Sequence, residues 1–117
     1  IDWEMGYEAV VSDAEEEPKW WSYEGRGGLE SWKSLHYIPI HDVDILGQGL
    51  LTRSVSRTVE YAYDDFCIGE MAAKLDRKED QVKYHERAGN WQNLYNENQI
   101  SLINEDDTGF VGFFQPR

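Results

Sequence analysis

The run SVSRTVEYAYDDF, residues 54–66, constrains the fold of this chain more than any other stretch. Small hydroxyl residues, which favour helix N-caps, precede a carboxylate and two tyrosines. The apolar residues of this region recur at spacings of three and four: Val59, Ala62, Tyr63, Phe66, Cys67, Met71 and Leu75. This periodicity predicts a helix from about Ser56 to Leu75, with Ser54, Ser56 or Thr58 as its cap. An ordinary amphipathic helix needs an apolar stripe but does not need polar and aromatic residues in its first turns. The run therefore also indicates a function.

Two further helices are predicted on the same grounds. The first extends from Asp2, its N-cap, to about Glu16, because the residue before Pro18 is disfavoured in a helix. The other spans Gln81–Asn96, where the aromatic and small residues Tyr84, Ala88, Trp91 and Tyr95 are spaced four, three and four apart. A short charged link, 76–80, separates this helix from the preceding one. The two helices should therefore be antiparallel neighbours.

The remaining segments read as loops and extended chain. We expect irregular structure over 19–28, a short helix over Leu29–Leu35, an extended segment over 37–40 and a loop over 41–49. The tail should form two extended segments, 100–103 and 110–114, around a turn at 104–109. The predicted fold class is mainly α: helical hairpins with long loops and a short extended C-terminal tail.

The charge of the chain excludes some classes of partner. The 117 residues carry a formal net charge of −12, which argues against nucleic acid, since phosphate binding needs clustered Lys and Arg. It also disfavours anionic membrane surfaces. An acidic chain suits a neutral polyol or a divalent cation. Cys67 is the single cysteine, so neither an intrachain disulfide nor a thiolate metal site is possible.

Several side chains could bind a ligand, and each has a structural alternative. Glu60 and Asp64 lie four residues apart on one helix face, with Asp65 beside them. Such carboxylates serve acid–base chemistry or bind calcium, or they simply form a solvated acidic face. Tyr61 could contact a sugar or pack against the protein. The tryptophans of the long loop, Trp20 and Trp21, could be stacking platforms or core residues, and the core interpretation is the safer one.

Four blocks in order along the chain carry a family resemblance. They are 24–28 together with 31–33, then 49–66, 87–95 and 108–117, with sequences EGRGG, SWK, GLLTRSVSRTVEYAYDDF, RAGNWQNLY and TGFVGFFQPR. In these blocks the chain resembles glycoside hydrolase family 92, the calcium-dependent exo-α-mannosidases, and most closely its fungal branch. Val59 stands where leucine is commoner.

The resemblance implies an (α/α)6 barrel behind an N-terminal β-sandwich. It implies removal of terminal α-linked mannose, commonly α-1,2-linked, by an inverting mechanism with bound calcium. On this basis we expect substrate binding by Glu60, Tyr61, Asp64, Trp32 and Arg26. The family's catalytic acid and base lie in motifs that do not occur before Arg117, so no catalytic residue is assigned. The calcium ligands are expected outside this chain, and a secreted parent is favoured.

The chain is therefore expected to be a single incomplete segment, 1–117, of a barrel catalytic domain, and to be inactive alone. Its expected partners are a mannose-containing glycan and either the remainder of the parent enzyme or a second copy, through exposed aromatic surface. Two alternatives stay open. One is a non-catalytic helical scaffold. The other is carbohydrate binding without catalysis, through Trp20, Trp21, Trp32 and Tyr61.

Overall fold

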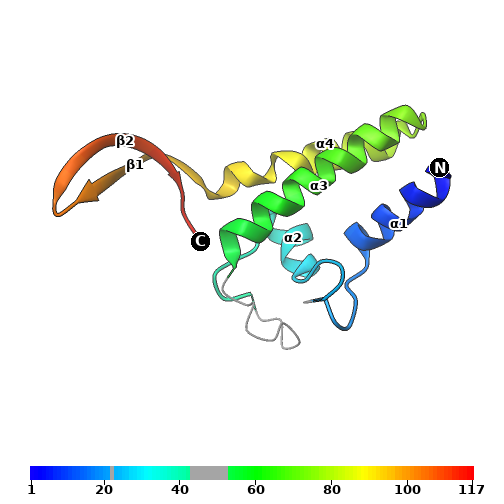
Figure 1. Ribbon diagram of the computed structural model, residues 1–117, viewed down its shortest axis with the longest axis horizontal. Coiled ribbons are helices and arrows are strands. Elements are labelled where there is room, and N and C mark those ends of the chain that lie inside the picture. The colour runs from blue at the N-terminus through cyan, green and yellow to red at the C-terminus, as the bar shows by residue number, and fades with distance from the viewer. Residues whose placement is uncertain (22, 43–52) are drawn as a thin grey trace.

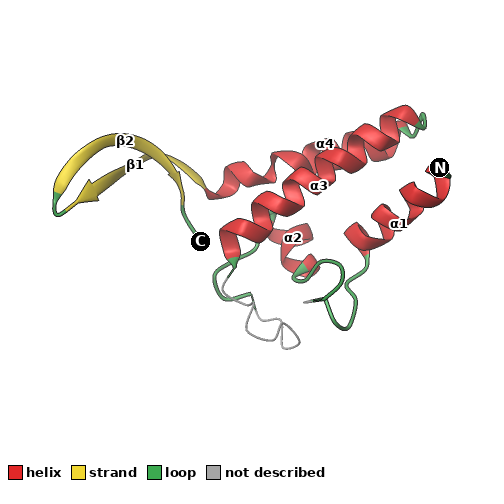
Figure 2. Ribbon diagram, in the orientation of Figure 1, coloured by secondary structure: helices red, strands yellow, loops and turns green. Residues whose placement is uncertain are grey.

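The computed structural model describes residues 1–21, 23–42 and 53–117. In this part of the chain, a helical body leads into a β-hairpin that projects from one end (Figures 1 and 2). The elements are α1 (Trp3–Glu15), α2 (Leu29–Leu35), α3 (Ser54–Lys74), α4 (Lys78–Ala88), the 3-10 helix η1 (Gly89–Leu94), β1 (Tyr95–Ile103) and β2 (Asp106–Phe114). The predicted mainly α class is confirmed, and a two-stranded antiparallel sheet accompanies it. Beyond Asp42, the predicted loop 41–49 lies outside the described residues.

Helix α1 begins as its sequence predicts. The Asp2 carboxylate accepts a hydrogen bond from the Met5 backbone N–H at 3.0 Å, which satisfies one of the free donors of the first turn. The helix ends at Glu15, and Glu16 takes an extended conformation ahead of Pro18. Tyr7 and Ala14 are its buried residues. The N-cap and the buried helical face are both confirmed.

The start of α3 differs from the prediction. The helix begins at Ser54, and the N-cap position is Arg53, which makes no side-chain capping bond. The predicted hydroxyl cap is therefore wrong. The Ser54 hydroxyl instead donates to the Ile38 carbonyl at 2.5 Å, and the Thr58 hydroxyl accepts from the Ile38 N–H at 2.9 Å. Both hydroxyls fix the segment after α2 against the first turns of α3.

The predicted apolar stripe of α3 is only partly the buried face. Tyr63 is 67% exposed, and Val59 and Phe66 are exposed as well. The buried residues of α3, several of them polar, are Ser54, Arg57, Thr58, Tyr61, Ala62, Asp65, Ile68, Gly69 and Ala72. Paired polar groups at four-residue intervals thus occupy the inner face, and the aromatic residues on the opposite side face outwards.

Two small cores lie on this inner face of α3. One joins α1, α3 and α4 through Tyr7, Ala14, Ile68, Ala72 and Tyr84. The other joins α2 and the following segment to the first half of α3 through Leu29, Trp32, Ile38, Tyr61 and Ala62. Each core draws on residues distant in sequence, so α3 is the element around which the other helices pack.

Helices α3 and α4 form the predicted antiparallel pair and lie side by side (Figure 1). Their close approach depends on Gly69, since a Cβ at this position would lie 2.3 Å from Cδ2 of His85. The predicted extent of α4, from Gln81 to Asn96, is wrong. It begins at Lys78 and ends at Ala88, and Gly89, a poor helix former, starts the 3-10 turn that leads to β1.

The hairpin is longer and tighter than predicted. Tyr95 pairs with Phe114 and Ile103 with Asp106, so the turn is only two residues long. Asn104 and Glu105 both have positive φ, 51° and 74°, as a type I′ turn requires. The hairpin leaves its apolar residues exposed: Ile100, Leu102, Ile103, Phe110, Val111, Phe113 and Phe114. Within the described residues, this sheet has little apolar cover.

Candidate functional site

A buried ion pair lies beneath α3. Arg26, from the glycine-rich loop before α2, places Nη1 2.6 Å from Oδ1 of Asp65. The other carboxylate oxygen of Asp65 accepts from Nε1 of Trp32, on α2, at 3.1 Å. All three side chains are buried. Burial raises the pKa of Asp65, and the charge and hydrogen bond of Arg26 oppose it. The ion pair ties the glycine-rich loop and α2 to the middle of α3.

Tyr61 extends this network by one helical turn. Its hydroxyl accepts from the Gly27 N–H and donates to the Gly27 carbonyl, both at 3.0 Å. The ring packs edge-on to Trp32 with centroids 5.8 Å apart, and the Arg26 guanidinium lies 5.2 Å from its centroid. Burial raises the pKa of Tyr61, so the phenol keeps its proton. The Tyr61 hydroxyl is thereby committed to the protein backbone.

A second buried ion pair lies next to the first. Nη1 of Arg57 is 3.0 Å from Oδ2 of Asp42, and Ser31 donates to the other oxygen of Asp42 at 2.8 Å. The Arg57 guanidinium also lies 5.1 Å from the ring centroid of Trp21. Trp21 in turn packs so closely on Gly27 that a Cβ there would lie 2.1 Å from the indole. The glycine-rich loop therefore serves to pack Trp21 and the two ion pairs closely together.

Glu60 and Asp64 lie on the exposed side of α3, close to this network. Partial burial raises the pKa of Asp64; the positive charge of Arg26 opposes the rise, and the carboxylates of Asp13, Asp65 and Glu60 add to it. An accessible carboxyl with a perturbed pKa beside a buried cation is typical of functional surfaces, although structural networks produce it too. These two carboxylates can accept hydrogen bonds from the hydroxyls of a ligand.

The five predicted substrate-binding residues divide into two groups. Arg26, Trp32 and Tyr61 converge around Asp65, and all three are buried and paired with protein groups in this structure. These three residues lie beneath α3 and support the helix whose exposed side carries Glu60 and Asp64. Glu60 and Asp64 are accessible, and their role in substrate binding stays a prediction.

The tryptophans follow the same division. Trp21 and Trp32 are core residues, as the safer interpretation has it, and Trp20 is exposed. Trp21, Trp32 and Tyr61 therefore offer no exposed ring face for a sugar. Of the four side chains considered for carbohydrate stacking, Trp20 alone has an open surface in this structure.

Sequence reasoning missed three members of the network, Asp65, Arg57 and Asp42. Charged residues are rarely buried unless paired, so burial was not predicted for any of them, and Asp65 was considered only as a ligand-binding carboxylate or as part of a solvated acidic face. A signal was nevertheless present, because Arg57, Tyr61 and Asp65 recur every four residues along one face of α3. That face also carries Ala62 and Ile68, which are buried.

No cluster of metal-binding side chains occurs among the residues that the structure describes. Among them, no group of three or more His, Cys, Asp or Glu side chains could hold a metal. Asp65, the acidic residue nearest Glu60 and Asp64 in the sequence, already has both oxygens engaged by Arg26 and Trp32. The oxygen-rich residues at 104–107 form and flank the hairpin turn.

Two solved structures that resemble this chain in fold are family GH92 mannosidases. The chain is 29% identical to the family GH92 inverting mannosidase from Bacteroides thetaiotaomicron, with a TM-score of 0.71 over 83% of this chain and 12% of that one. It is 28% identical to a family GH92 α-mannosidase of the same bacterium, with a TM-score of 0.63 over 95% of this chain and 14% of that one.

The sequence comparisons agree. The family model for the glycosyl hydrolase family 92 catalytic domain matches residues 1–117, so this chain belongs to glycoside hydrolase family 92. It is 60% identical over 117 residues to an "uncharacterized secreted glycosidase" of the fungus Arthroderma benhamiae, which covers all of this chain. The chain spans 15% of the length of that relative. None of the described helices is long and apolar enough to span a membrane.

Proposed function

We propose that this chain forms part of an exo-α-mannosidase that removes terminal α-linked mannose, α-1,2 linkages among them, with inversion and with bound calcium. The observation that carries the proposal is the match to the family 92 catalytic domain over the whole of 1–117. It is supported by the similarity in fold to a bacterial inverting mannosidase. The ligand implied is a mannose-containing glycan, which is neutral and compatible with an acidic chain.

In this proposal, residues 1–117 are one segment of an (α/α)6 barrel, and the remainder of the polypeptide supplies the other helices and the β-sandwich. The antiparallel pair α3 and α4 supports this placement, because such barrels are built from helical hairpins. The many exposed apolar residues of β1 and β2 also support it, since exposed apolar surface of this kind usually marks an interface. The family relative from Arthroderma benhamiae is named as secreted, and we extend secretion to the parent of this chain.

Within that enzyme, Glu60 and Asp64 would accept hydrogen bonds from mannose hydroxyls. The buried Arg26–Asp65 pair would hold their helix at a fixed height over the glycine-rich loop. The inverting reaction needs an acid and a base separated by roughly 6.5–9.5 Å, enough to admit a water molecule. We place both residues outside this chain, and the calcium ligands with them. The residues described here then bind and orient substrate without exchanging a proton with it.

A chimera tests the proposal. The matching segment of the Arthroderma benhamiae glycosidase, 60% identical to this chain, would be replaced by residues 1–117. The chimera and the unmodified glycosidase should both release mannose from α-1,2-mannobiose, and a chelator should stop the release. The isolated chain should release none. Failure of both complete proteins to release mannose, or robust release by the isolated chain, would contradict the proposal.

A further inference from the structure

A pocket of about 430 Å³ lies where η1 meets the start of β1, and we call it the η1–β1 pocket. It is lined by Trp91, Gln92, Tyr95, Asn96 and Glu97. The rings of Trp91 and Tyr95 meet edge to face with centroids 6.0 Å apart, and both rings are partly exposed. Two aromatic rings, two amides and a carboxylate therefore surround one pocket.

The hairpin holds one wall of this pocket in place. The Tyr95 ring packs edge-on against Phe114, with centroids 5.5 Å apart. Gly112 leaves room for the phenol, since a Cβ at this position would lie 2.2 Å from Oη of Tyr95. The amide of Asn96 is also fixed, because its Nδ2 donates to Oε1 of Gln115 at 2.8 Å. This wall is therefore formed before any ligand arrives.

The two remaining polar side chains of the pocket are uncommitted. Gln92 and Glu97 are exposed, and neither side chain makes a hydrogen bond or ion pair with another residue that the structure describes. An apolar protein segment placed here would bury these groups without partners, which is costly. The Glu97 carboxylate and the net charge of −12 disfavour an anion. The pocket therefore fits a neutral ligand with hydroxyl groups and an apolar ring face, as a pyranose has.

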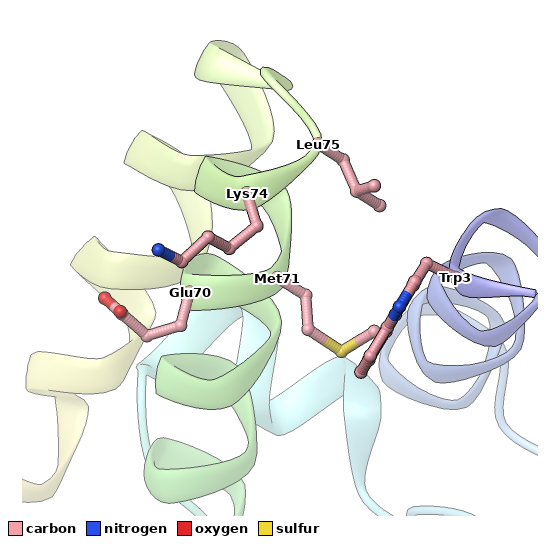
Figure 3. Close-up of a pocket in the computed structure, with 5 residues that line it drawn as sticks. All are labelled: Trp3, Glu70, Met71, Lys74 and Leu75. Atoms are coloured by element: carbon pink, nitrogen blue, oxygen red, sulfur yellow. The ribbon is translucent and has the colours of Figure 1, made fainter. Parts of the chain in front are cut away.

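The groove between α1 and α3 has a different chemistry (Figure 3). The Met71 side chain extends there towards the indole of Trp3, which is 59% exposed. The polar ends of Glu70 and Lys74 are directed away from Trp3. An exposed tryptophan flanked by uncommitted polar groups thus distinguishes the η1–β1 pocket from this groove, and Trp3 is a matched control for Trp91.

We propose that the η1–β1 pocket binds a sugar residue of a neutral glycan, with Trp91 as the stacking surface and Gln92 and Glu97 as hydrogen-bond partners. The indole supplies an apolar face for the C–H groups of a pyranose. The Gln92 amide can donate to and accept from sugar hydroxyls, and the Glu97 carboxylate can accept from them. The choice of mannose as the sugar rests on the proposed function, whereas the site itself rests on the contacts above.

Trp91 also connects this pocket to the exposed side of α3. It lines a second groove together with Val59 and Tyr63. These two residues directly precede Glu60 and Asp64 in the sequence. The η1–β1 pocket is a separate site from those two carboxylates, and a glycan longer than one residue could contact both.

Hydroxyl-radical footprinting, resolved by peptide mass spectrometry, tests the site without any substitution, because tryptophan side chains are readily oxidised. The chimera is footprinted with and without α-1,2-mannobiose, in the presence of chelator so that the sugar is not hydrolysed. The oxidation rate of Trp91, relative to that of Trp3, should fall severalfold when the sugar is present. Trp3 corrects for radicals that the sugar itself consumes. An unchanged ratio would overturn the proposal.

The other possible occupants give distinct results. In the chimera without sugar, oxidation of Trp91 as slow as that of the buried Trp32 would mean that the remainder of the polypeptide covers the pocket, and would overturn the proposal. Slower oxidation of Trp91 as the concentration of sugar-free chimera rises would assign the pocket to a second copy and overturn it as well. The footprint does not depend on mannose release, so its failure and that of the proposed function can be told apart.

Two substitutions at exposed positions test the hydrogen-bond partners. Gln92→Ala and Glu97→Ala should each raise severalfold the concentration of α-1,2-mannobiose that half-protects Trp91, because each removes a group that binds a sugar hydroxyl. Glu79→Ala is the control: this exposed carboxylate lies on α4 and does not line the pocket, so the half-protecting concentration should stay the same. Equal half-protecting concentrations in all three variants would contradict the assignment.

Discussion

Arg26 and Asp65 are 39 positions apart in sequence, yet their side chains meet at 2.6 Å in the interior, where Trp32 completes the coordination of the carboxylate. Buried ion pairs contribute little net stability compared with apolar replacements, but breaking one by removing a single partner leaves an uncompensated charge. This pair links the glycine-rich loop to the helix that carries Glu60 and Asp64. The integrity of the exposed face of α3 therefore depends on it.

Asp65→Asn should destabilise the isolated chain by about 3–5 kcal/mol, because the Arg26 guanidinium loses its counter-charge in a buried position. Urea unfolding followed by tryptophan fluorescence measures this change. Asp64→Asn, the neighbouring but exposed carboxylate, is the matched control and should change the free energy of unfolding by no more than about 0.5 kcal/mol. Similar values for the two variants would show that the buried pair does not support α3.

Glu15 should make the chain sensitive to acid. Its carboxylate accepts bonds from Arg87, Lys83, Lys33 and Tyr84. Partial burial alone would raise the pKa of Glu15, but these bonds outweigh burial and hold it well below its ordinary value of 4.5. Because the folded pKa is depressed, the stabilisation is present above pH 4.5 and is lost as the pH falls below it towards the folded pKa.

Glu15→Gln should therefore reduce the loss of stability below pH 4.5, and it should lower the stability of the chain near neutral pH. Thermal unfolding between pH 2.5 and pH 7 measures both effects. Glu8→Gln, an exposed position on the same helix, should retain the pH dependence of the unsubstituted chain. If Glu15→Gln kept the same pH profile as Glu8→Gln, the carboxylate would not be the acid-sensitive group.

Gly69→Ala should separate α3 from α4, since the added Cβ would lie 2.3 Å from the His85 ring. Overpacking of this kind costs about 1–3 kcal/mol. Gly6→Ala, in α1, is the control: no atom lies within 4 Å of its added Cβ, and removing a helical glycine should stabilise the chain by up to about 1 kcal/mol. Opposite signs for the two substitutions are expected in the same unfolding assay; a neutral Gly69→Ala would mean that the helix pair tolerates a wider spacing.

In the chimera, Glu60→Gln and Asp64→Asn should each lower kcat/KM for α-1,2-mannobiose by roughly 10- to 100-fold, as expected for one lost hydrogen bond to a charged group. The steady-state rate of mannose release measures this. Glu79→Gln, an exposed carboxylate on α4, should leave the rate unchanged. Unaltered kcat/KM in both Glu60→Gln and Asp64→Asn would remove these residues from the substrate site.

Local signals in the sequence predicted α1, α2 and α3 well. Asp2 capped α1, Gly28 and Leu35 bounded α2, and the periodicity placed α3 to within two residues of its start. The inner face of α3 could not be predicted this way, because Arg57 and Asp65 are buried only through partners that lie 15 and 39 residues away. Hydrophobic periodicity cannot register such pairs. For the same reason it assigned the exposed Tyr63 and Phe66 to the core.

The C-terminal region shows a different limit. Tyr95 continued the helical spacing of α4, so the helix was predicted to reach Asn96, but both residues belong to β1, where Tyr95 packs against Phe114 with centroids 5.5 Å apart. The position of Tyr95 is compatible with the end of a helix and with the start of a strand. Pairing with β2, which the local sequence does not reveal, decides that it begins a strand. The buried Trp21, in the irregular segment between α1 and α2, together with family membership, also argues against the helical-scaffold alternative.

The most direct test of the central claim is the anomeric form of the mannose that the chimera releases. Proton NMR of α-1,2-mannobiose hydrolysis, recorded within the first minutes, identifies the anomer formed before mutarotation. An inverting exo-α-mannosidase that contains this segment should produce β-mannose first, and only in the absence of chelator. Initial release of α-mannose, or no release by a correctly folded chimera and its parent glycosidase, would contradict the proposed function.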